Sequence, residues 1–148
     1  DDGNALRVRE YYYDARKEGM SRTDEEHYKE LEKLAGSLAP YIRAVIVDPS
    51  AASFITCIHR HGTFPVWKAN NSVIDGIRDT AALLKLGKIH ICAGCKDIIR
   101  EFGLYRWDDK HTDKDTVIKE NDHAMDDMRY FCYTVLNNRG GKFVNISI

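Results

Sequence analysis

Hydrophobic positions along the chain change spacing several times, between the alternation typical of strands and the three-to-four-residue repeat typical of helices. Strand patterns fall at residues 6–14, 44–47, 64–69 and 88–93, and helix patterns fall at about 24–38, 51–60, 72–86 and 96–106. A polar stretch at 107–119 precedes a last helix pattern that begins near residue 121. Strands that alternate with helices are typical of a sheet covered by helices. We therefore predict one α/β domain with parallel strands after an antiparallel start.

Several helix boundaries carry residues that are suited to capping. Thr23 and Glu26 have the spacing of a capping box, and Ser72 lies just before a later helix pattern. Gly62 and Gly87 each follow a helix pattern, where a glycine readily adopts the left-handed backbone of a helix end. In the segment before the first of these helices, alternation places Tyr12 on the face opposite its two tyrosine neighbours, which favours strand packing over base stacking.

The start of the last helix is the part of the chain that is richest in candidate chemistry. Asp122 and Asp126 lie one turn apart on the same stripe, His123 lies beside them, and Asp127 is one step further round. Apolar residues repeat behind this stripe, so the acids should lie at the edge of the buried face. Two interpretations are open. The acids suit the positive end of the helix dipole, or a divalent metal joins them.

Asp48 directly follows the apolar strand pattern at 44–47. Pro49 stops the strand and leaves Asp48 at its tip, which is where ligands bind in open α/β sheets. An acid in this position also serves as a helix cap, either by itself or beside Ser50. Asp48 is therefore a candidate metal ligand or a candidate cap.

Composition narrows the possible functions. The 148 residues are 43% hydrophobic and carry a formal net charge of −1, which suits a single domain with one core but gives no long-range attraction to nucleic acid. Any contact with DNA must come from a local basic face, such as one formed by Arg60, Lys68, Lys85, Lys88 and Lys96, of which Lys68 is the candidate phosphate contact. No apolar run approaches the roughly 20 residues of a membrane span, so we predict a soluble protein with no membrane partner.

The four cysteines lie mostly in apolar segments, as expected of reduced thiols in a cytosol. Cys92 and Cys95 have the Cys-x-x-Cys spacing, but a zinc site needs a second pair of ligands. His59 and His61 form the one histidine pair, and nothing in the sequence places them near these cysteines. Strand packing is the simpler interpretation of Cys92 and Cys95.

Four segments together resemble the nuclease domain of the terminase large subunit of tailed phages or prophages. These are Val-Ile-Val-Asp-Pro-Ser at 45–50, Lys-Ala-Asn-Asn-Ser-Val-Ile-Asp-Gly-Ile at 68–77, Glu101 with Tyr-Arg-Trp at 105–107, and Asn-Asp-His-Ala-Met-Asp-Asp-Met-Arg-Tyr at 121–130. The last segment is the most specific. The resemblance makes residues 1–139 a terminase nuclease domain, followed at 140–148 by a tail or edge strand that begins with a glycine pair.

The resemblance implies a ribonuclease-H-like mixed sheet flanked by helices. It also implies a DNA endonuclease that uses two Mg²⁺ or Mn²⁺ ions to cut concatemeric viral DNA during genome packaging. The catalytic residues implied are Asp48, Asp126 and His123, and the metal ligands are the same three with Asp122. The implied partners are double-stranded DNA, the terminase ATPase domain, the small terminase subunit and the portal. The implied location is the cytoplasm of the bacterial host, at the viral procapsid.

The chain departs from the family pattern at its start. The family places its first catalytic aspartate on a strand before residues 6–14, and that strand is not in the sequence, nor is a Walker-type phosphate loop. The turn signature at 1–4 has no strand before it, so we infer that the natural polypeptide continues upstream of Asp1. We therefore interpret the chain as a truncated nuclease domain in which metal binding is weakened.

Two other functions are compatible with the residues. A non-catalytic module would bind DNA or dock to a portal and keep its acids as a surface patch. A small metal-dependent phosphatase or transferase would also use paired acids on an α/β sheet. Glu101 and Arg129 are expected to form ion pairs rather than to take part in catalysis.

Overall fold

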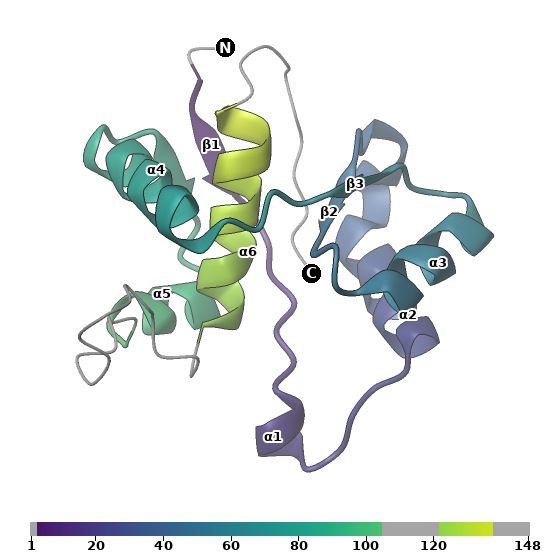
Figure 1. The fold of residues 1–148 in the computed structure, drawn as a ribbon. Helices are drawn as coiled ribbons and strands as arrows, with labels where there is room; N and C mark the ends of the chain where they lie inside the picture. The colour runs from purple at the N-terminus through teal and green to yellow at the C-terminus, as the bar shows by residue number, and fades with distance from the viewer. Residues whose placement is uncertain (1–2, 105–121, 138–148) are drawn as a thin grey trace.

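The computed structural model describes residues 3–104 and 122–137, and Figure 1 shows how its elements are arranged. The strands are β1 (Ala5–Arg7), β2 (Val45–Val47), β3 (Val66–Lys68) and β4 (Ile89–Ile91). The helices are α1 (Ala15–Glu18), α2 (Asp24–Ala35), α3 (Ala52–His61), α4 (Val73–Lys85), α5 (Lys96–Phe102) and α6 (His123–Phe131). A 3₁₀ segment (Gly36–Tyr41) follows α2, and a π-helical segment (Cys132–Leu136) continues α6. The predicted α/β class is confirmed.

The strands form two separate parallel pairs. β1 pairs with β4, with Ala5 opposite Ile89, and β2 pairs with β3, with Val45 opposite Val66. The predicted antiparallel start is wrong for the described residues, because both of these pairings are parallel. The strand predicted at 6–14 also ends early, at Arg7.

Residues 8–14 run as an extended segment without strand partners between two groups of elements (Figure 1). Its side chains pack against helices, whereas a strand would be held by hydrogen bonds to a neighbouring strand. The rings of Tyr11 and Tyr13 both lie against His27 of α2, whereas the ring of Tyr12 lies against His123 of α6. The predicted alternation of the three tyrosines is therefore confirmed, although the faces that they meet are helices rather than neighbouring strands.

Two clusters of buried side chains form the core. The first lies among α2, α3, β2 and β3, and its fully enclosed members include Leu31, Val45 and Ile58. The second lies among α5, α6 and the segment that follows α6, around Ile98 and Cys132. The two groups of elements lie on either side of segment 8–14 in Figure 1. Side chains that face this segment from both groups are therefore placed to meet.

Most predicted helix boundaries are confirmed. Thr23 and Glu26 form a complete capping box, in which the Thr23 hydroxyl accepts from the Glu26 backbone and the Glu26 carboxylate accepts from the Thr23 backbone. Gly62 ends α3 in the left-handed conformation, with φ 71°. Ser72 lies at the N-cap position of α4 but makes no capping hydrogen bond there. The loop predicted at 107–119 and the tail at 140–148 lie outside the described residues.

A candidate carboxylate site

Asp48 directly follows β2, which ends at Val47 as predicted from the sequence. One of its carboxylate oxygens accepts a 2.8 Å hydrogen bond from the backbone N–H of Ser50, and the other accepts a short hydrogen bond from the hydroxyl of Tyr130. Ala51 is the N-cap of α3, and no side chain caps this helix. The side chain of Asp48 is therefore not a helix cap, and it reaches across to α6 through Tyr130.

Helix α6 presents the remaining acids, and its start is fixed by a buried glutamate from a neighbouring helix. Glu101 of α5 has no exposed surface, and its Oε2 accepts hydrogen bonds from the backbone N–H groups of Ala124 (2.8 Å) and Met125 (3.0 Å). A carboxylate in this position satisfies free donors and suits the positive end of the helix dipole. Asp122 is the N-cap residue, but its side chain makes no capping hydrogen bond. Glu101 therefore performs the capping role that the sequence left open for the acids of the helix itself.

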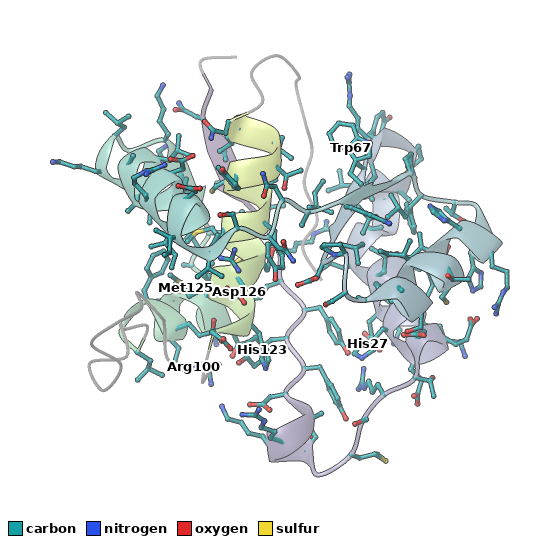
Figure 2. All side chains as sticks on the ribbon, viewed as in Figure 1. His27, Trp67, Arg100, His123, Met125 and Asp126 are labelled. Carbon is teal, nitrogen blue, oxygen red and sulfur yellow. The ribbon has the colours of Figure 1, made fainter. Side chains whose placement is uncertain are left out.

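A cavity of about 490 Å³ collects side chains from segment 8–14, from the end of β2 and from α6. Asp48, His123, Asp126 and Asp127 are among the described residues that line it. Figure 2 shows His123 and Asp126 on α6, with His27, another lining residue, on the far side of segment 8–14. The structure thus brings together three of the four predicted metal ligands, which come from positions up to 78 residues apart in the chain.

Asp122 and Lys68 are not among the described residues that line this cavity. Asp122 is 9% exposed, and its Oδ1 lies 3.9 Å from Nδ1 of His123, a separation that gives an ion pair only when His123 is protonated. Lys68 ends β3, beside the strand that leads to Asp48, and its side chain is exposed. Both residues are therefore neighbours of the cavity rather than part of its wall.

Among the described residues, four carboxylates line the cavity, and those of Asp48, Asp126 and Asp127 each have their own intramolecular donor. Arg129 binds Asp126 through Nε (3.2 Å) and Nη2 (2.8 Å), so the ion pair predicted for Arg129 is confirmed. Arg7 of β1 donates to Asp127 at 2.7 Å, and Tyr130 donates to Asp48. The charges of Asp126 and Asp127 are thus compensated by arginines, whereas the charge of Asp48 is stabilised by a hydrogen bond from a phenol.

Arg129 is itself held tightly. It is 4% exposed, and its Nη1 donates to the backbone carbonyls of Asn71 (3.1 Å) and Ser72 (2.9 Å), just before α4. Gly76 of α4 makes room for it, because a Cβ at that position would lie 2.8 Å from Cγ of Arg129. The side chain of Asp126 is therefore positioned by a buried arginine that joins α4 to α6.

Hydrogen bonding shifts the pKa of two groups at Asp48. Burial would raise the pKa of Asp48, but the hydrogen bonds from Tyr130 and from Ser50 outweigh burial and lower it below its ordinary value. Burial and the Asp48 carboxylate raise the pKa of the Tyr130 phenol. Asp48 is therefore ionised and Tyr130 neutral at neutral pH, the states in which a tyrosine donates and a carboxylate accepts.

Sequence reasoning missed Asp127, Arg7 and Tyr130. Asp127 was set apart because it lies one helical step from the stripe of Asp122 and Asp126, yet it lines the cavity and pairs with Arg7. Tyr130 lies one turn beyond Asp126, a spacing that would have placed it on the same face. The partner of Arg7 is 120 residues away, so no local pattern indicated the pair.

The donor set of the cavity suits a hard cation, because Mg²⁺ and Mn²⁺ prefer carboxylate oxygens. The acids nevertheless line one cavity without sharing one coordination sphere. Among residues 3–104 and 122–137, the only group of three or more candidate ligand atoms within 4.8 Å of one another belongs to Glu25, Cys57 and His61. A metal that binds these carboxylates would therefore have to displace at least some of the hydrogen-bond donors that contact them now.

A scan against protein-family models and a search of curated proteins each gave no match. Solved structures of the large terminase from a thermophilic bacteriophage do match. The structure in complex with ADP and the one in complex with ATP-γ-S each align with a TM-score of 0.86 and 42% identity over 92% of this chain. A second crystal form aligns with a TM-score of 0.84 and 41% identity.

The chain spans about one third of the length of these terminase chains, with 34% and 35% covered in the two nucleotide complexes. The match and the helix-flanked parallel strands are consistent with the ribonuclease-H-like fold that was predicted. None of the helices in the described ranges is long and apolar enough to cross a membrane. In sequence and in fold, the chain is therefore similar to one third of a phage large terminase.

Proposed function

We propose that the chain is the nuclease part of a phage large terminase, a metal-dependent endonuclease that cuts concatemeric viral DNA during genome packaging. The observation that carries this proposal is the convergence of Asp48 from β2 with Asp126 and Asp127 from α6 on one cavity. The similarity to a phage large terminase supports a role in packaging. The proposed site of action is the bacterial cytoplasm at the procapsid, with double-stranded DNA as substrate.

The proposed roles follow from the position of each side chain. When bound, two divalent cations would activate a water molecule and compensate charge at the leaving oxygen of a phosphodiester. Asp48 and Asp126 would bind Mg²⁺ or Mn²⁺ through carboxylate oxygens. Asp127 would be a further metal ligand, and Asp122 a more distant one. His123, whose side chain is 61% exposed beside the acids, would coordinate metal or transfer a proton. The exposed amine of Lys68 would contact phosphate.

A plasmid-nicking assay with Mn²⁺ tests the proposal. We expect the chain to nick supercoiled plasmid slowly and Asp126→Asn to abolish nicking while the far-ultraviolet circular dichroism spectrum is unchanged. Because Asp126 is bound to Arg129, Arg129→Lys is a useful second variant, since it keeps the positive charge but loses the two-nitrogen contact. Nicking that persists at full rate in Asp126→Asn would contradict the proposal.

A second function has support from one observation. Asp48, Asp126 and Asp127 already have intramolecular donors, as expected of acids that stabilise a fold. A module without catalysis would use this fold to bind DNA or to dock onto other parts of the packaging motor, such as the ATPase domain, the small subunit or the portal. Absence of nicking in both the parent chain and Asp126→Asn, with equal DNA binding, would favour this second function.

A further inference from the structure

A second group of candidate ligands lies outside the carboxylate cavity, where α2 packs on α3. Glu25 is in the first turn of α2, and Cys57 and His61 lie four residues apart on α3. Their ligand atoms all lie within 4.8 Å of one another. Sγ of Cys57 is 3.5 Å from one Glu25 oxygen, and Nε2 of His61 is 2.8 Å from the other.

These separations are close to those that a tetrahedral metal requires. Zinc bonds of about 2.3 Å to sulfur and about 2.0–2.2 Å to nitrogen or oxygen place two tetrahedral ligands roughly 3.3–3.7 Å apart. The separation of Cys57 from Glu25 Oε1 already has this value, and that of His61 from Glu25 Oε2 needs to open by about half an ångström. Because the two separations involve different oxygens, the carboxylate must also turn so that one of them meets both groups, which the 4.8 Å spacing of the three ligand atoms allows. A Cys and a His four residues apart on one helix present their ligand atoms on the same face.

The surroundings hold the thiol and the imidazole and leave the carboxylate free to adjust. Cys57 is 3% exposed, and the ring of His61 stacks on Tyr28 with centroids 3.8 Å apart and planes 8° from parallel. The side chains of Glu25 and His61 are 51% and 37% exposed, so a metal ion has access from solvent. Arg60 lies 3.7 Å from Glu25, but its side chain is 71% exposed and is free to move away.

We propose that Glu25, Cys57 and His61 form a binding site for Zn²⁺ that joins α2 to α3, with a water molecule as the fourth ligand. A thiolate, an imidazole and a carboxylate suit zinc, whereas Mg²⁺ prefers oxygen ligands alone. The site is separate from the carboxylate cavity and does not rest on the proposed nuclease activity. It also uses neither Cys92 nor Cys95, the pair whose spacing suggested zinc in the sequence.

The protonation states of the cluster are consistent with this role. The thiol of Cys57 donates a hydrogen bond to Glu25. Burial is the main cause that raises the pKa of this thiol, and the Glu25 carboxylate raises it further. The hydrogen bond from His61 lowers the pKa of Glu25, so the carboxylate is already ionised. Metal binding would release the proton of Cys57, and its affinity should therefore rise with pH.

Cobalt spectroscopy tests the site, because Co²⁺ adopts the same coordination as Zn²⁺ and reports on thiolate ligation. We expect a thiolate-to-cobalt charge-transfer band when Co²⁺ is added to the reduced chain, and its loss when Zn²⁺ is added afterwards. Cys57→Ser should remove the band, whereas Cys92→Ser should keep it, since Cys92 is a thiol outside the cluster.

Glu25 is half exposed, so Glu25→Gln is not expected to disturb the core, whereas His61→Gln also removes a ring that stacks on the buried Tyr28. Glu25→Gln and His61→Gln should each weaken Zn²⁺ binding by more than about 100-fold in competition with a chelating dye, since loss of an outer-shell partner alone costs about 10–100-fold. Zn²⁺ should raise the melting temperature of the parent chain and not that of either variant. A band that survives Cys57→Ser, or Zn²⁺ affinity that is unchanged in both Gln variants, would overturn the proposal.

Discussion

The carboxylate cavity and the Glu25–Cys57–His61 cluster gather candidate ligands in opposite ways. In the cavity, Asp48, Asp126 and Asp127 are each bound by a different partner, Tyr130, Arg129 and Arg7 respectively. In the cluster, the candidate ligands are hydrogen-bonded to one another. A cation that binds in the cavity must therefore displace the present hydrogen-bond donors of the acids, whereas a cation that binds at the cluster replaces the thiol proton of Cys57.

The carboxylate cavity and the Glu25–Cys57–His61 cluster also depend on different parts of the fold. The cluster needs only the packing of α2 on α3. The cavity needs β2, segment 8–14 and α6 in register, and α6 is fixed by a buried glutamate from α5 and by a buried arginine that reaches α4. Changes remote from the acids should therefore disturb the cavity and leave the cluster intact.

The largest effect is expected from Glu101→Ala. This variant leaves the N–H groups of Ala124 and Met125 without their buried acceptor, and hydrogen bonds to a charged group contribute about 1.5–3 kcal/mol each. Urea denaturation should show a loss of about 3 kcal/mol in the free energy of unfolding. Glu101→Gln keeps an oxygen acceptor and should lose less. Equal stability of Glu101→Ala and the parent chain would mean that α6 does not depend on this cap.

A smaller loss is expected from Gly76→Ala. Alanine gains about 1 kcal/mol of helix propensity over glycine, but its Cβ would overlap Arg129, and overpacking costs about 1–3 kcal/mol. We expect a net loss of stability together with weaker Mn²⁺ binding, because Asp126 loses its support. Gly103→Ala is the matched control, since a Cβ there lies 3.6 Å from its nearest neighbour. A stabilised Gly76→Ala variant would show that Arg129 moves freely.

Tyr130→Phe tests the donor of Asp48. Losing the hydrogen bond to the ionised carboxylate should cost about 1.5 kcal/mol at neutral pH. The lowered pKa of Asp48 gives stability that is present above the unfolded value, near 3.8, and is lost as the pH falls through the lower folded value. Tyr130→Phe should therefore lose less stability than the parent chain when chemical denaturation is repeated at successively lower pH below about 4. A parallel decline in both proteins would contradict this assignment.

The smallest effect is expected from Lys68→Ala. An exposed lysine that contacts one phosphate adds about one unit to the salt dependence of DNA binding and little to stability. Fluorescence anisotropy at several salt concentrations should give a slope that is shallower by about one. Lys29→Ala, an exposed lysine of α2 outside the candidate basic face, is the comparison and should leave the slope unchanged.

The alternation of hydrophobic spacing was enough to predict the class of the fold and most helix boundaries, because periodicity and capping are local. The strand at 6–14 was predicted too long, because side chains that alternate along an extended segment can pack against helices as well as belong to a sheet. Tyr12 and Tyr13, for example, pack on histidines of α6 and α2. Asp48 and Asp126 were predicted from a strand tip and a helix stripe. The zinc cluster was not, because Glu25 is 32 residues from Cys57 and no sequence spacing joins them.

We propose that Asp48 and Asp126 bind one divalent metal centre in common. Calorimetric titration of Mn²⁺ into the parent chain, Asp48→Asn, Asp126→Asn and the double variant tests it most directly, with Glu18→Gln as a control acid on α1. We predict that each single variant weakens Mn²⁺ binding by at least about tenfold and that the double variant is little worse than either, since the two acids act as one unit. Binding that is indifferent to both substitutions, or losses that add in full, would contradict a shared centre.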